Sequence, residues 1–104
     1  MEIENMERIV KSLRIKKIYF DEIKAGSKKI EYREKKPYYD SRLRKKLTHI
    51  IFHYQKSAKI LVEVKSIRVI NAPKKLIPEM KKLNFKNTKK IYAITLGRSR
   101  TLRR

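Results

Sequence analysis

The chain has 104 residues, of which 30 are Lys or Arg and 10 are Asp or Glu, so its formal net charge is +20. The length fits one domain, and no apolar run approaches the roughly 20 residues that a membrane-spanning helix needs. Hydrophobic residues make up 40% of the chain, slightly below the roughly 45–50% of an average protein. They are mainly Ile, Leu, Val, Tyr and Phe in periodic runs, which favours a folded domain over disorder.

Several kinds of chemistry are excluded by residue types that are absent or rare. Without cysteine there is no disulfide, no thiolate zinc site and no Cys nucleophile. The two imidazoles, His49 and His53, lie in a strand pattern without a third ligand nearby in sequence, so we expect no metal site and no cofactor. The acidic start of the chain is not followed by an apolar run, so it does not resemble a secretory signal. We therefore expect a cytoplasmic protein.

The excess of cations predicts a polyanionic partner, because Lys and Arg release condensed counterions from phosphate backbones. We expect RNA, and single-stranded or looped bases in particular, because side chains cannot read the narrow major groove of an A-form duplex. No membrane partner is expected. A small nucleoside and an acidic protein remain alternative partners, and the sequence predicts no oligomeric state.

The first part of the chain predicts a strand and a helix after an acidic start. Residues 1–9 are expected to form a short helix or a frayed end. Residues 12–15 predict a short strand, and residues 17–25 have the spacing of a helix. Gly26 is suited to end this helix, because glycine adopts the left-handed conformation at little steric cost. The apolar side of the helix is expected to consist of Ile18, Tyr19, Phe20 and Ile23.

A strand, a loop and a short helix are expected next. Residues 29–33 alternate between apolar and charged side chains, which predicts a half-buried strand with Tyr32 in the core. Pro37 predicts a loop over residues 35–40. The spacing of Leu43 and Leu47 favours a short basic helix over residues 41–47.

The remaining part of the chain is rich in strand patterns. Strands are expected over residues 48–54, 59–70 and 90–96, and the second of them is long enough to be bent or bulged. Residues 72–84 favour a helix that Pro78 interrupts, and Gly97 is expected to close the last strand. Many short strands with few helices predict an α+β domain on a small mixed sheet or barrel.

One segment carries the strongest indication of function. Lys28 lies at the start of a predicted strand, and Glu31 and Arg33 share one face of that strand. Arg33 can clamp a phosphate or a carboxylate with two parallel hydrogen bonds. Glu31 can accept from a base, hold Arg33 or act as a general base, and Lys28 can neutralise a phosphate or polarise a carbonyl. A salt bridge on a solvated strand face explains the same spacing.

These residues and Gly26 form a G-x-K-x-x-E-x-R pattern directly after the first predicted helix. Residues 12–43, SLRIKKIYFDEIKAGSKKIEYREKKPYYDSRL, thereby resemble the start of the ASCH domain, a branch of the PUA-like superfamily. The segments THIIFHY, KILVEVKSIRVI and KKIYAITLGR follow in the order that this family has. The resemblance covers residues 11–98, which leaves residues 1–10 as an extension and residues 99–104 as a basic tail.

The resemblance implies a small mixed β-barrel with a few flanking helices, and a cleft beside the motif that binds RNA. One branch of the family hydrolyses the acetyl amide of N4-acetylcytidine with a Lys, a Thr three residues later and a Glu on a later strand. Here Lys28 fits the first position, Glu31 replaces the Thr, and Glu63 can stand for the later Glu. A hydrolase of this kind, or a ribonuclease as in a few other members, is the alternative to a non-catalytic RNA-binding module.

Two tyrosines are expected beside the motif. Tyr38 and Tyr39 lie in a basic segment, and exposed aromatic rings among cations suit the stacking of single-stranded bases. Packing of one ring under the loop explains them equally well. The predicted ligand-binding residues are Gly26, Lys28, Glu31, Arg33, Tyr38 and Tyr39.

Overall fold

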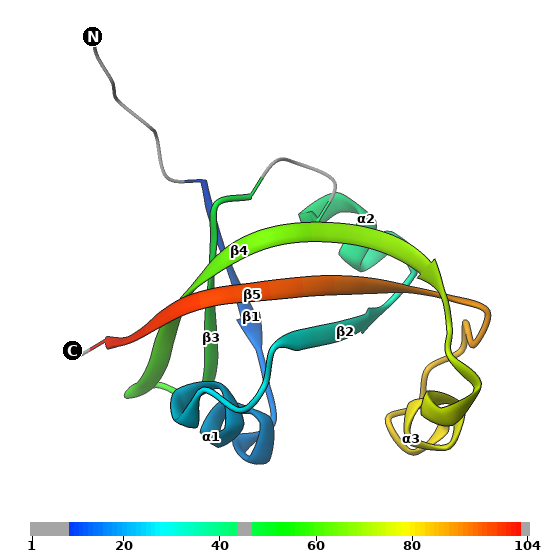
Figure 1. The fold of residues 1–104 in the computed structure, drawn as a ribbon, viewed down its shortest axis with the longest axis horizontal. Coiled ribbons are helices and arrows are strands. Elements are labelled where there is room, and N and C mark those ends of the chain that lie inside the picture. The colour runs from blue at the N-terminus through cyan, green and yellow to red at the C-terminus, as the bar shows by residue number, and fades with distance from the viewer. Residues whose placement is uncertain (1–8, 44–46, 103–104) are drawn as a thin grey trace, which may run out of the picture.

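The computed structural model describes residues 9–43 and 47–102 (Figure 1). Its strands are β1 (Val10–Arg14), β2 (Ile30–Glu34), β3 (His49–Gln55), β4 (Ala58–Asn71) and β5 (Lys90–Leu102). Its helices are α1 (Lys17–Ala25), α2 (Pro37–Leu43) and α3 (Ile77–Lys82), the last preceded by a 3-10 turn over Lys74–Leu76. The expectation for residues 1–8 lies outside the described residues.

The strands form one sheet in the order β1-β3-β4-β5-β2. β1 pairs parallel with β3, and the other pairs are antiparallel. β4 and β5 are long and strongly curved, so the sheet curls into a half-barrel (Figure 1). This confirms the predicted α+β class and is consistent with a small PUA-like barrel. None of the described helices is long and apolar enough to cross a membrane.

The bend predicted for the long strand is confirmed and has a local cause. The pairing of β4 with β5 shifts register on both sides of Val64, because each strand in turn carries an extra residue. Gly97 lies in the first shift, where an added Cβ would be 2.4 Å from Glu63 Oε1. Gly97 therefore allows the side chain of Glu63 to approach the backbone of β5 closely. The expectation that Gly97 closes the last strand is wrong, because β5 continues beyond it. Residues 99–102, expected in a basic tail, continue β5 as far as Leu102.

The main core lies inside the curl of the sheet. Phe20 and Ile23 of α1 are buried there, whereas Ile18, expected on the same apolar side, is 62% exposed. The core consists of Leu13, Ile15, Phe20, Ile23, Leu43, Leu47, Ile50, Phe52, Ile60, Val62, Tyr92, Ile94 and Leu96. The predicted limits of α1 are confirmed, and Gly26 ends it with a left-handed φ of 81°.

Two proline-containing segments differ from the predictions. Pro37 begins α2, because the fixed φ of proline suits the first turn of a helix, where its missing N–H breaks no hydrogen bond. The loop predicted over residues 35–40 is therefore wrong in its second half. Pro78 likewise lies in the first turn of α3, so the helix predicted over residues 72–84 is shorter and begins as a 3-10 turn.

Candidate ligand-binding pocket

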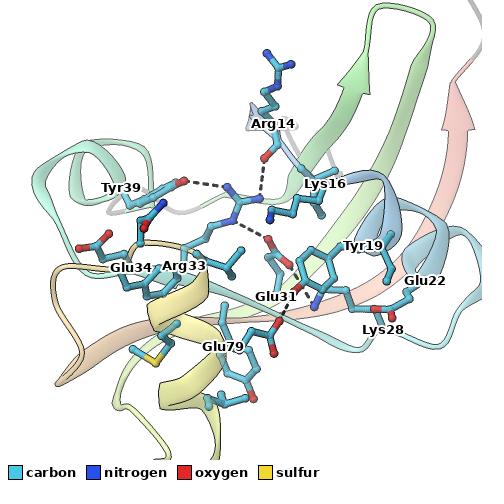
Figure 2. Close-up of a pocket in the computed structure, with 18 of the residues that line it drawn as sticks. Arg14, Lys16, Tyr19, Glu22, Lys28, Glu31, Arg33, Glu34, Tyr39 and Glu79 are labelled. Carbon is cyan, nitrogen blue, oxygen red and sulfur yellow. Dashed lines mark hydrogen bonds and ion pairs between the residues drawn. The ribbon is translucent and has the colours of Figure 1, made fainter.

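A pocket of about 740 Å3 lies beside β2, which is an edge strand of the sheet (Figure 2). The end of β1, the first turns of α1, the segment before β2, and α2 and α3 with the turns around them contribute to its wall. The charged residues and tyrosines that line the pocket are Arg14, Lys16, Tyr19, Glu22, Lys28, Glu31, Tyr32, Arg33, Glu34, Lys36, Tyr39 and Glu79. Its volume is within the range of small-molecule sites, roughly 300–1,000 Å3.

Glu31 holds the two motif cations together. Its carboxylate accepts from Nε of Arg33 at 2.7 Å and lies 3.4 Å from Nζ of Lys28. Glu31 is only 5% exposed, and Figure 2 shows it between the two cations. A buried carboxylate needs such compensation, because burial of an unpaired charge is strongly unfavourable. Glu31 and Arg33 therefore form the salt bridge that their spacing on one strand face predicts, but the face is buried and not solvated.

Arg33 ties three parts of the fold together. Besides Glu31, its guanidinium donates to the hydroxyl of Tyr39 on α2 and to the carbonyl of Arg14 at the end of β1, each at 2.9 Å. Since β1 and β2 are the two edges of the sheet, this side chain bridges the gap of the half-barrel. Burial opposes its charge, but Glu31 and Tyr39 outweigh that effect and raise the pKa of Arg33 above its ordinary value. Each of its three nitrogens already donates to one protein acceptor, which leaves two of the five N–H groups of the guanidinium, so the bidentate clamp on a ligand stays a prediction.

Tyr19 forms a link between α1 and α3. Its hydroxyl donates to Glu79, 60 residues later in the chain, and the ammonium of Lys28 lies 4.7 Å from its ring centroid. The hydrogen bond to Glu79, burial, and the carboxylates of Glu79, Glu31 and Glu22 raise the pKa of Tyr19 to about 12. Tyr19 is therefore a neutral hydrogen-bonding group in the pocket wall at ordinary pH.

Glu34 fixes the segment that follows α3. It is 5% exposed, and its carboxylate accepts from the backbone N–H groups of Lys86 at 2.8 Å and Asn87 at 2.9 Å. The ammonium of Lys36 lies 3.6 Å from its other oxygen. This anchor holds the turn after α3 against β2. The apolar part of the pocket wall here consists of Leu76, Met80, Leu83 and Phe85.

The structure brings together only part of the predicted ligand-binding set. Lys28, Glu31, Arg33 and Tyr39 line the pocket, and Gly26 ends α1 without lining it. Tyr38 is 50% exposed outside the pocket, where the guanidinium of Arg42 stacks 3.7 Å from its ring centroid. The two tyrosines contact each other edge to face.

The second acid of the hydrolase alternative lies elsewhere. Glu63 is exposed on β4, does not line the pocket, and accepts from the backbone N–H of Arg98 at 3.3 Å. The constellation of Lys28, Glu31 and Glu63 is therefore not assembled in this structure. Among the described residues, no group of three His, Asp or Glu side chains is placed to hold a metal ion.

Sequence reasoning missed most of the pocket wall. Tyr32, predicted in the core, is half-buried and lines the pocket. Helical spacing assigns Tyr19 only to an apolar helix face, and no sequence pattern predicts a role for Glu22, Glu34 or Glu79. The concentration of acidic residues around the motif in a basic chain was a signal for Glu22 and Glu34, but no local pattern pointed to α3.

The comparison with known families agrees with this geometry. Residues 13–96 match the family model of the ASCH domain, which covers most of the chain, and the chain belongs to that family. ASCH domains are generally linked to RNA binding. No curated protein and no solved structure was found to match the chain.

Proposed function

We propose that this protein is an RNA-binding module whose pocket takes one base or nucleotide of an RNA strand, while the basic surface around it holds the phosphate backbone. The observation that carries the proposal is the convergence of the family motif on a ligand-sized pocket in a protein of net charge +20. Phosphate contacts give affinity without reading bases. A pocket that receives a base adds selectivity, as in other readers of unpaired RNA.

The motif residues have different parts in this proposal. Lys28 is the motif cation best placed to contact a ligand, since it makes a single 3.4 Å ion pair and its side chain is 14% exposed. Glu31 and Arg33 shape the pocket and orient Lys28 and Tyr39. Tyr38 and its stacked Arg42 lie outside the pocket, where they can contact a neighbouring base of the strand.

The test is a salt titration of binding to labelled single-stranded RNA, duplex RNA, single-stranded DNA and duplex DNA, followed by fluorescence anisotropy. The informative pair of variants is Lys28→Met and Lys29→Met, because both remove one positive charge and Lys29 is exposed outside the pocket. We expect single-stranded RNA to be preferred at about 150 mM salt, where exposed charges more than about 8 Å apart are largely screened.

Lys28→Met is expected to lower the affinity for single-stranded RNA by about fivefold to tenfold, the loss of one charged contact of about 1–1.4 kcal/mol. Lys29→Met is expected to reduce the salt dependence slightly for every ligand alike. Equal effects of the two variants, or equal binding of all four nucleic acids, would show that the charge acts as a nonspecific polyelectrolyte and that the pocket has another role.

The amidohydrolase alternative has less support, because the pocket holds Glu31 where the related amidohydrolases have Thr, and Glu63 lies outside the pocket.

A further inference from the structure

The pocket departs sharply from the charge of the whole molecule. Among the described residues there are seven Asp and Glu side chains, and four of them line the pocket: Glu22, Glu31, Glu34 and Glu79. Five of the far more numerous Lys and Arg side chains line it: Arg14, Lys16, Lys28, Arg33 and Lys36. A chain of net charge +20 thus has a pocket in which the two signs are nearly balanced.

The cations of the pocket are mostly compensated already. Lys28 and Arg33 both pair with Glu31, and Lys36 pairs with Glu34. Figure 2 shows the guanidinium of Arg14 pointing away from Arg33 and from the other labelled side chains. Among the cations that line the pocket, Arg14 and Lys16 form no ion pair within the described residues, and both are exposed.

Two of the four carboxylates that line the pocket are not compensated by an ion pair with a Lys or Arg side chain. Within the described part of the chain, Glu22 and Glu79 form no ion pair, although Glu79 accepts the hydroxyl of Tyr19. They come from the two helices that flank the pocket, α1 and α3. A phosphate inside the pocket would meet these charges at short range, while the distant surface cations are screened by salt. A base carries no charge and can donate N–H groups to carboxylates.

Resting on the function proposed above, we propose that Glu22 and Glu79 are specificity-determining residues: they exclude phosphate from the pocket, so that it takes the uncharged heterocycle of a nucleotide and leaves the phosphates on the basic surface outside. The apolar wall from α3 and the neutral Tyr19 suit the faces of such a ring. The pocket would then bind a nucleoside as well as the matching nucleotide, although the protein as a whole attracts polyanions.

The test compares adenosine and cytidine with their 5′-monophosphates, titrated into the full chain at about 150 mM salt to limit long-range attraction. Backbone amide shifts of the pocket residues, followed by NMR, separate binding in the pocket from binding to the basic surface. For the wild-type protein we expect the monophosphate to bind in the pocket no more tightly than the nucleoside. Inorganic phosphate is expected not to displace the nucleoside.

Glu22→Gln and Glu79→Gln are each expected to improve pocket binding of the monophosphate relative to the nucleoside by about fivefold, as for one unit charge several ångströms away in a partly hydrated site. Asp21→Asn is the matched control, since it removes the same charge one residue from Glu22 at a position that does not line the pocket.

Three results would overturn the proposal: pocket binding of the monophosphate at least fivefold tighter than that of the nucleoside, equal effects of Asp21→Asn and Glu22→Gln, or no pocket binding of either compound at millimolar concentration. The RNA titration with Lys28→Met decides the proposed function separately. Loss of RNA preference in that variant together with a tightly bound monophosphate would keep the RNA-binding function and refute the exclusion of phosphate.

Discussion

Replacement of Arg33 by Lys tests whether this residue serves the fold or the ligand. Arg33 donates to three acceptors, the carboxylate of Glu31, the hydroxyl of Tyr39 and the carbonyl of Arg14, and its side chain is 11% exposed. A lysine at this position keeps the charge and the ion pair with Glu31, but it cannot reach the other two acceptors in the fork geometry of a guanidinium.

The expected loss follows from those two hydrogen bonds. Hydrogen bonds that involve a charged group contribute about 1.5–3 kcal/mol each, so we expect Arg33→Lys to lower the free energy of unfolding by about 3 kcal/mol. For a domain of this size, each kcal/mol corresponds to about 4–8 °C in Tm, so Tm should fall by about 15 °C. Urea unfolding followed by far-UV circular dichroism measures the change, since the chain has no Trp.

Arg14→Lys is the matched control, because the side chain of Arg14 is exposed and the contact with Arg33 uses only its backbone carbonyl. This variant is expected to stay within about 0.5 kcal/mol of the wild-type protein. If Arg33→Lys is equally mild but abolishes binding of RNA, the reasoning is refuted, and Arg33 contacts the ligand directly.

Three further predictions concern other contacts of the fold. Gly97→Ala should destabilise the protein by about 0.5–1 kcal/mol, because the new Cβ meets the exposed side chain of Glu63, whose carboxylate end can move aside; thermal unfolding measures this. Glu34→Gln should lower stability by about 1–2 kcal/mol, because a neutral acceptor replaces a charged one for two backbone N–H groups, and hydrogen exchange should speed up at Lys86 and Asn87. The raised pKa of Tyr19 favours its neutral form in the folded state, so its contribution to stability is present below pH 10 and is lost as the pH rises towards about 12. Unfolding of wild type and Tyr19→Phe over that range measures the loss.

Each of these predictions has a distinct contradicting outcome. Combining Gly97→Ala with Glu63→Ala should recover most of the stability, and a double variant as unstable as the single one places the strain elsewhere. Faster exchange along the whole of β2 in Glu34→Gln would indicate general loosening in place of a local anchor. Identical pH profiles of wild type and Tyr19→Phe between pH 10 and about 12 would contradict the effect assigned to Tyr19.

The sequence predicted best those elements whose signals are local. The limits of α1 follow from helical spacing and from Gly26, whose left-handed φ is confirmed. Alternation placed Glu31 and Arg33 on one face of β2, but a period of two does not tell which face is buried. Glu31 can lie on a buried face because two cations compensate its charge. Tyr32 borders the pocket because β2 is an edge strand of the sheet.

The parts that sequence reasoning missed depend on contacts between distant segments. Tyr19 meets Glu79 across 60 residues, and no local pattern connects the two. The sequence predicts a strand end at Gly97, because the reason for the glycine, the close approach of Glu63 on β4, is visible only in the tertiary structure. The motif therefore predicted where the pocket lies, whereas the opposite wall from α3 required the tertiary structure.

The position of β2 in the sheet has a consequence for the folding of the chain. β2 pairs with β5 alone, and some 60 residues separate the paired positions, such as Glu31 and Ile94. Contacts between such distant residues form slowly, because a long loop must close first. On the ribosome, the segment that carries Lys28, Glu31 and Arg33 must wait without its strand partner until β5 emerges. The emergence of β5 from the ribosome thus decides when the molecule first acquires its pocket.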